Sequence, residues 1–272
     1  MTWWSMLLGR VLMTDREILV DKRRDNYGTL RVTENREGYR FLYFGEQTEQ
    51  SCVFITDPAW LEYDYTRAML LGTFWCGREA DMTLLGLGGG ALANCLVRHF
   101  APHTVSAVEL RGEVLAMARE WLGLSDDPQL QVSIGCAEKH VAAAPASCDL
   151  LFVDLYMEGG LSRLQLQAEF FRHCQQALRP GGVLVINQWQ MGDTGLPYAA
   201  PLLRDLFGDD YLQVQVEEGN IILFIPAAGD PPLTLDRSVM TDWAAALEPA
   251  LGYALKPYIN DLCRARDNPG PL

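Results

Sequence analysis

The segment at residues 83–94, TLLGLGGGALAN, constrains the fold of this chain more than any other stretch. An apolar run of strand length leads into glycines at positions 86, 88, 89 and 90, and apolar residues at helical spacing follow. A strand, a glycine turn and a helix in this order suit a nucleotide-type ligand. Glycines let the backbone turn tightly and approach the ligand, and the helix N-terminus presents unpaired N–H groups. Glycine-rich turns also join strands to helices without a ligand, so the segment alone leaves both readings open.

From residue 82 onward, apolar runs of strand length alternate with helical patterns, which predicts an α/β fold with a Rossmann-like, doubly wound, mainly parallel sheet. We expect strands at 82–87, 104–109, 130–134, 148–154, 181–187, 211–216 and 220–225. We expect helices at 90–100, 111–122, 162–178 and 197–207, and a helical tail over 236–263. The turn around Gly219 predicts a hairpin between the last two strands, and therefore an antiparallel edge.

The N-terminal part has a different pattern. Short runs rich in β-branched and aromatic residues, separated by turn residues, predict a small antiparallel β unit. Its strands are expected at 18–20, 29–33, 39–44 and 52–55, followed by a helix over 60–75. We therefore predict two domains, a small N-terminal β domain at 1–65 and a Rossmann-like domain at 66–272.

Composition excludes some classes of partner. The 272 residues are 49% hydrophobic and 21% charged, as in folded soluble proteins, and the net charge of −13 argues against nucleic acid or an anionic membrane. Seven scattered cysteines without a C-x-x-C pair fit reduced thiols in the cytoplasm. The four histidines lack metal-ligand spacing, so no metal is expected. Residues 1–13 are apolar but too short to span a bilayer, and we interpret them as packed structure at an interface.

Two carboxylates stand where expected strands end, which is where open α/β sheets bind ligands. Glu109 closes the second strand about twenty residues after the glycines, the position from which an acid accepts hydrogen bonds from ribose hydroxyls. Asp154 closes the fourth strand and could stabilise a sulfonium or accept a proton from an amine. The alternatives are a solvated glutamate and a turn or helix-capping aspartate. After the fifth strand, the polar and aromatic cluster at 187–190 could line a pocket wall.

Several short motifs, spread over roughly residues 18–225, carry a family resemblance. They are Gln50-Ser51, YTRAM at 65–69, LGLGGG at 85–90, VEL at 108–110, FVD at 152–154 and LRPGGVLV at 178–185. With these motifs the chain resembles the spermidine synthase (polyamine aminopropyltransferase) family, which has the fold of the S-adenosylmethionine-dependent methyltransferases. The resemblance implies a methyltransferase-type sheet preceded by a small antiparallel β unit, and a homodimer.

The resemblance also implies an activity and site residues. The family transfers an aminopropyl group from an S-adenosyl donor to a small-molecule amine without a metal, and it implies Asp154 as the general base. S-adenosylmethionine or its decarboxylated form is the expected donor. The residues expected to bind the donor are Gly86, Gly88, Gly90, Glu109, Cys136 and Ala137. Those expected to bind the acceptor are Gln50, Tyr65, Tyr156, Glu158, Gln188 and Trp189.

Three positions depart from the family pattern. Met157 stands at the second position of the Asp-x-x-Asp motif, with Glu158 as a candidate replacement. Gly89 takes the place of the loop aspartate that contacts the donor's amine, and Gly135-Cys136 replaces the Gly-Asp that reaches adenine. The adenosine half of the site is thus better preserved than the amine half. A small-molecule methyltransferase and a non-catalytic relative that retains only ligand binding stay open, whereas the glycine spacing disfavours a dinucleotide dehydrogenase.

Overall fold

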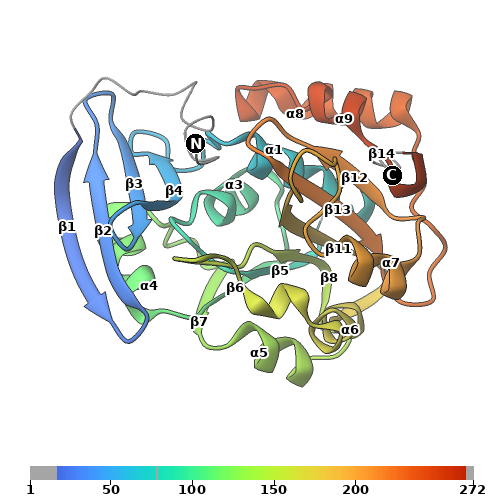
Figure 1. Ribbon diagram of the computed structural model, residues 1–272. Helices are drawn as coiled ribbons and strands as arrows, with labels where there is room; N and C mark the ends of the chain where they lie inside the picture. Colours follow the sequence, from blue (N-terminus) through green and yellow to red (C-terminus); the bar gives the residue numbers. More distant parts are fainter. Residues whose placement is uncertain (1–16, 78, 268–272) are drawn as a thin grey trace.

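The computed structural model describes residues 17–77 and 79–267, which form a small sheet at one end of a larger one (Figure 1). The prediction for residues 1–13 falls outside this described part. The small sheet is four-stranded and antiparallel, in the order β1-β2-β3-β4. Its strands are β1 (Ile18–Asp25), β2 (Gly28–Glu34), β3 (Tyr39–Phe44) and β4 (Thr48–Phe54). The predicted antiparallel β unit is therefore present.

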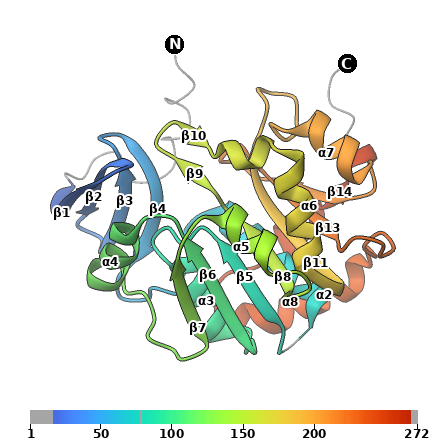
Figure 2. The same cartoon turned by 90° about the horizontal axis from the view of Figure 1, so that it is seen from below.

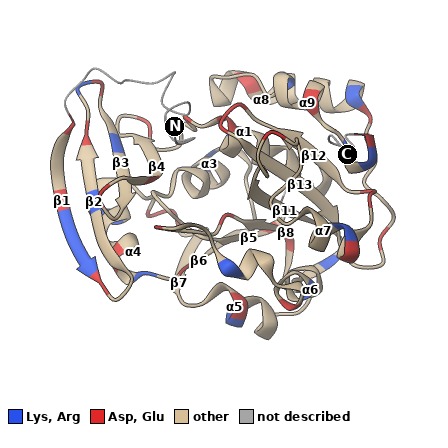
Figure 3. Ribbon diagram, viewed as in Figure 1, with Lys and Arg blue, Asp and Glu red and all other residues tan. Residues whose placement is uncertain are grey.

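Two strands of the small sheet are longer than expected. β1 continues through the charged run at residues 21–25 (Figure 3), where Arg23 forms ion pairs with Asp21, Glu113 and Glu120 and Asp25 forms one with Arg111. β4 begins four residues early, at Thr48. The inner face of the sheet packs on α4 (Gly112–Trp121), whose Val114 and Met117 are fully buried against Leu30 and Leu42.

The large sheet has eight strands in the order β14-β12-β13-β11-β8-β5-β6-β7. They are β5 (Asp81–Leu85), β6 (Thr104–Glu109), β7 (Leu130–Ile134), β8 (Cys148–Val153), β11 (Leu178–Trp189), β12 (Leu212–Gln215), β13 (Asn220–Pro226) and β14 (Cys263–Arg264). The pairings from β7 across to β11 are parallel, and those of β13, β12 and β14 are antiparallel. The predicted Rossmann-like, mainly parallel sheet is confirmed.

The predicted hairpin of β12 and β13 is present, and this edge of the sheet is antiparallel as expected. The chain also returns after its last helices, and β14 adds an unexpected antiparallel strand outside β12. A strand of two residues is too short to leave a period in the sequence.

Helices cover both faces of the large sheet (Figure 2). One face carries α1 (Asp64–Met69), the 3-10 turn η2 (Leu70–Gly72), α2 (Thr73–Cys76), α3 (Ala91–His99), α8 (Arg237–Leu251) and α9 (Lys256–Asp261). The other carries α5 (Ala137–Ala143), α6 (Ala168–Ala177) and α7 (Ala200–Phe207). The predicted domain boundary after residue 65 falls inside α1, and the division into two domains remains a prediction.

Three helix predictions need correction. The helix expected over 60–75 starts only at Asp64. The one expected over 162–178 is broken at Gln167, where extended backbone separates the 3-10 turn η3 (Arg163–Leu166) from α6. The tail divides at Gly252, whose left-handed conformation (φ 78°) ends α8. α5 was not predicted.

Candidate active site

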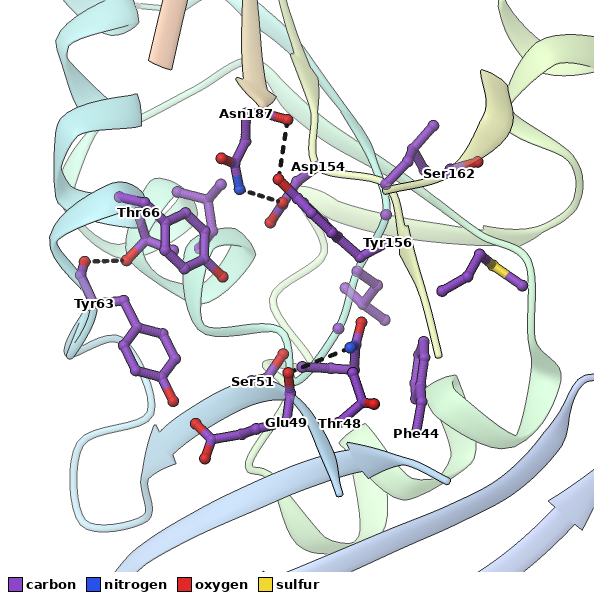
Figure 4. A pocket seen from close by; sticks show the side chains of 18 of the residues that line it. Phe44, Thr48, Glu49, Ser51, Tyr63, Thr66, Asp154, Tyr156, Ser162 and Asn187 are labelled. Atoms are coloured by element: carbon purple, nitrogen blue, oxygen red, sulfur yellow. Dashed lines mark hydrogen bonds between the residues drawn. The ribbon is translucent and has the colours of Figure 1, made fainter. Parts of the chain in front are cut away.

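A cavity of about 900 Å³ opens where the carboxyl ends of β5, β6, β8 and β11 meet β4 and α1 (Figure 4). This is the edge at which doubly wound sheets bind ligands. Most of the site residues predicted from the sequence line this cavity. They are Gln50, Tyr65, Gly86, Gly88, Gly90, Glu109, Cys136, Ala137, Asp154, Tyr156 and Trp189.

The glycine loop after β5 is shaped by close backbone approaches. Gly86 has φ 97°, and a Cβ there would lie 2.2 Å from the carbonyl oxygen of Asp154. Only glycine therefore lets the ends of β5 and β8 meet. Gly89 donates its N–H to Ser51 Oγ at 2.8 Å, and a Cβ on Gly88 would lie 2.4 Å from the same oxygen. β4 of the small sheet thus closes one side of the loop.

Glu109 is held in the cavity wall by backbone N–H groups. Its side chain is buried, and its two oxygens accept from Leu87 N at 3.1 Å and Arg111 N at 2.9 Å. Burial raises the pKa of Glu109, and the backbone N–H groups act against that rise. Each carboxylate oxygen retains a lone pair, so the group can accept the two hydroxyls of a ribose. The arrangement fits the adenosine part of an S-adenosyl ligand.

Cys136 and Ala137 lie beside Glu109 at the start of α5. Gly135 N donates to the carbonyl of Glu109 at 2.9 Å, which fixes their position next to the end of β6. The short helix α5 therefore brings these two residues to the cavity, although no helical signal was recognised there in the sequence.

Asp154 lies deeper in the cavity. Asn187 Nδ2 donates to Asp154 Oδ1 at 2.9 Å (Figure 4). Burial raises the pKa of Asp154 to about 6, and the Asn187 hydrogen bond opposes this rise. Burial and then the Asp154 charge hold the pKa values of Tyr65 and Tyr156 well above the usual range, so both phenols stay protonated. Asp154 therefore has a pKa that suits proton transfer near neutral pH, as does Glu49 in the same cavity, whose pKa burial raises to about 7.

The acceptor side of the cavity is aromatic. The Tyr156 and Trp189 rings lie 5.5 Å apart between centroids, and Tyr63 stacks on Tyr65 at 5.7 Å. Tyr156 also donates its hydroxyl to the carbonyl of Asn187 at 3.3 Å. Aromatic faces beside a carboxylate form a site that favours an ammonium group.

Glu158 does not line the cavity, contrary to the expectation that it replaces the second aspartate. It follows Met157 in the hairpin of β9 (Tyr156–Met157) and β10 (Gly160–Leu161). At this turn its side chain lies against Gly28 and Gly45 of the small sheet. Its carbonyl accepts from Thr48 Oγ1 at 3.1 Å.

Gln188 also lies elsewhere. Successive side chains of a strand point to opposite faces, so Asn187 and Trp189 of β11 reach the cavity while Gln188 is fully buried behind it. Its Nε2 donates to Gln165 Oε1 at 3.0 Å, and its Oε1 accepts from Ala199 N at 3.0 Å. Its contacts are therefore structural.

The structure adds cavity residues that the sequence did not indicate. They are Glu49, Tyr63, Ser162, Glu218 and Asn220, among others. Asn187 belongs to the cluster at 187–190 that was expected to line a pocket wall, and it does line the cavity. Glu218 lies in a hairpin turn, where acidic residues are common, and gave no signal. Among the described residues no group of three or more His, Cys, Asp or Glu side chains could hold a metal ion, and no helix there is long and apolar enough to cross a membrane.

Comparisons with known proteins agree with this geometry. Residues 69–192 match the model of the spermine/spermidine synthase domain. The polyamine aminopropyltransferase of Chromobacterium violaceum is 27% identical over 230 residues, which cover 82% of this chain and 85% of that protein.

Solved structures show the same fold. A spermidine synthase in complex with the transition-state analogue AdoDATO superposes with a TM-score of 0.68 at 14% identity, over 89% of this chain and 84% of that one. Human methyltransferase-like protein 13 in complex with SAH gives 0.57 at 22% identity, over 70% and 93%. The chain is therefore similar in sequence to the spermidine synthase-like family, and it shares the fold of these enzymes and of the S-adenosylmethionine-dependent methyltransferases.

Proposed function

We propose that this protein transfers an aminopropyl group from an S-adenosyl donor to an amine nitrogen of a polyamine. The observation that carries the proposal is the position of Asp154, a carboxylate of raised pKa between the glycine loop and the aromatic wall. The names of the relatives, polyamine aminopropyltransferase and spermidine synthase, support the same reaction.

The glycine loop and Glu109 would hold the donor's adenosine, with Cys136 and Ala137 beside the base. When bound, the donor supplies an alkyl carbon activated by a positively charged sulfur. Because Gly86 lies against the Asp154 backbone, a donor held by the loop would lie beside the general base.

Asp154 has the chemistry that the acceptor requires. An amine arrives mostly as an ammonium ion, and its nitrogen has no free electron pair until a proton leaves. The Asp154 carboxylate takes that proton. The freed pair forms the new N–C bond as the C–S bond breaks and its electron pair returns to sulfur. The positive charge passes from sulfur to the product nitrogen, and Asp154 returns its proton to solvent.

The charge of the cavity favours a donor without a carboxylate. Within the described part of the chain, both arginines that line the cavity are already bound. Arg31 donates to the carbonyls of Gly45 and Glu46. Arg111 forms two hydrogen bonds with the Asp25 carboxylate, at 2.8 and 2.9 Å. The donor that we propose is therefore decarboxylated S-adenosylmethionine.

The test is to supply each donor with a linear diamine and identify the thioether released. Methylthioadenosine from the decarboxylated donor supports the proposal. S-adenosylhomocysteine from ordinary S-adenosylmethionine would indicate a methyltransferase, and binding of adenosine ligands without turnover a non-catalytic relative. Asp154→Asn should abolish release while leaving donor affinity within about twofold, because the variant keeps the size of the side chain.

The resemblance also implies a homodimer in the cytoplasm, and both remain proposals. Sedimentation of the full chain tests the first, and fractionation of the source cells tests the second. If sedimentation finds a monomer that has full transfer activity, the site does not require a dimer.

A further inference from the structure

A linear diamine brings two ammonium groups into the cavity. Asp154 binds and deprotonates the one that attacks the donor. Met157 offers no charge at the second motif position, and Glu158 faces the small sheet. The proposed function therefore needs another carboxylate in the wall for the second nitrogen.

Glu218 lies in the turn between β12 and β13 and lines the cavity. Its Oε1 accepts from Asp64 N at 2.8 Å, which fixes the side chain at the start of α1. Its Oε2 is buried and has no hydrogen-bond partner among the described residues. A buried carboxylate oxygen without a partner is costly, and an ammonium N–H would satisfy it.

Burial raises the pKa of Glu218, and the Asp64 N–H and the charge of Arg67 oppose this rise. A ligand ammonium would favour the carboxylate form in the same way. Arg67 Nε donates to the carbonyl of Leu61 at 2.6 Å, and its Nη1 lies 3.6 Å from Asp64 Oδ1. The guanidinium stacks over the Tyr253 ring, 4.5 Å from the centroid. Arg67 is thus engaged elsewhere and leaves Glu218 free to bind a ligand cation.

Glu218 and Asp154 belong to the same part of the cavity. Both carboxylates line the cavity together with Tyr65, and after burial their charges are among those that raise the pKa of the Tyr65 hydroxyl. Asn220, two residues after Glu218, donates to Asn187 Oδ1 at 2.8 Å, and Asn187 in turn donates to Asp154. A chain of side-chain hydrogen bonds therefore ties the Glu218 turn to the general base.

We propose that Glu218 is a specificity-determining residue that binds the second ammonium of a linear diamine whose first nitrogen lies at Asp154. This assignment rests on the proposed function for its substrate class. It makes the acceptor a molecule with two positive ends, because a monoamine leaves Glu218 Oε2 without a donor.

The test is calorimetric titration of 1,4-diaminobutane and of butylamine into the full chain saturated with methylthioadenosine. Glu218→Gln retains an oxygen for the Asp64 N–H and removes the charge. We expect it to weaken diamine binding about tenfold or more and to leave butylamine binding unchanged. Glu217→Gln removes a charge one residue earlier, outside the cavity wall, and should leave both affinities unchanged.

Glu218→Asp provides a second variant, informative even where Glu218→Gln fails to fold. It keeps the charge but draws it back by one methylene, so preference should shift from 1,4-diaminobutane to 1,5-diaminopentane. Unchanged diamine affinity in Glu218→Gln, equal losses for both amines, no shift in Glu218→Asp, or no diamine binding by the native chain would each overturn the assignment. Glu218-dependent binding without transfer would instead reject the proposed function and retain the assignment.

Discussion

Asn187 Nδ2 lies 2.9 Å from Asp154 Oδ1, at the ends of two neighbouring parallel strands. Asn220 sets the orientation of this amide, because its Nδ2 donates to Asn187 Oδ1 at 2.8 Å and leaves the Asn187 N–H₂ facing Asp154. Burial favours the neutral acid and this amide favours the carboxylate, so the two effects together set the pKa of Asp154.

The first prediction concerns pH. With a pKa of about 6, Asp154 is ionised at pH 7 and protonated at pH 5. A general base works only when deprotonated, so kcat/KM should fall about tenfold per pH unit below pH 6. Initial rates between pH 5 and 8 at saturating donor measure this decline, which is the acidic limb of the pH–rate profile. A rate that does not fall between pH 7 and 5 would argue against Asp154 as the base.

Removing the Asn187 amide should move that limb. Asn187→Ala leaves burial unopposed, so the pKa of Asp154 rises and the acidic limb shifts upward by about one pH unit. The matched control is Asn220→Ala, which removes a partner of Asn187 and no direct partner of Asp154. It should shift the limb less. Equal shifts in the two variants would mean that amide orientation, rather than the bond to Asp154, sets the pKa.

Asp154 should also limit stability. Its pKa is higher in the folded protein, about 6, than the ordinary 3.8, so folding takes up a proton between these values. Its contribution to stability is therefore most favourable below about pH 4 and is lost as pH rises to about 6. At pH 7, Asp154→Asn should raise the free energy of unfolding by on the order of 1 kcal/mol. Thermal melts of the variant and the native protein at pH 4 and 7 check this. A variant that melts at a lower temperature than the native protein at pH 7 would contradict the prediction.

The Gly86 approach can be tested by adding one methyl group. Gly86→Ala places a Cβ 2.2 Å from the Asp154 carbonyl at φ 97°, and should cost about 2 kcal/mol or more of stability and weaken methylthioadenosine binding. Gly229→Ala is the control, because Gly229 also has a positive φ, 86°, but a Cβ there meets nothing within 4 Å. Denaturant unfolding of both variants separates the cost of the contact from that of the dihedral. Equal losses would mean that the contact contributes nothing.

Cys136 offers a chemical probe of the donor site. It is only partly buried and lines the cavity, whereas Cys263 is partly buried and lies outside it. Methylthioadenosine should slow alkylation of Cys136 by iodoacetamide about tenfold or more, at ligand concentrations well above Kd, and leave Cys263 unaffected. Peptide mass spectrometry reads both sites in one digest. Unprotected Cys136 in the presence of bound ligand would place the adenosine elsewhere.

The sequence predicts the donor half of the cavity better than the acceptor half. Glu109 and Asp154 each stand at the end of an apolar strand. This is a local pattern, so it can be recognised without knowledge of the tertiary structure. Gln188 was misplaced because its parity on β11 depends on register against two neighbouring strands. One residue of difference moves a side chain to the other face. Asn187, whose side chain points to the opposite face from Gln188, lines the cavity and donates to Asp154.

Short or irregular elements were beyond sequence patterns. The two-residue strands β9 and β10 turn Glu158 away from the cavity, and nothing in their length produces a period. Glu218 reaches the cavity only because the turn after β12 packs on α1. Such positions follow from contacts between segments about 150 residues apart, which local propensity does not encode.

The hydrogen bond from Gly89 N to Ser51 Oγ joins the glycine loop of the large sheet to β4 of the small one. The donor pocket is consequently a property of the docked pair of sheets, because each sheet supplies part of its wall. A ligand that fills the pocket contacts both sheets, so its binding free energy also opposes their separation.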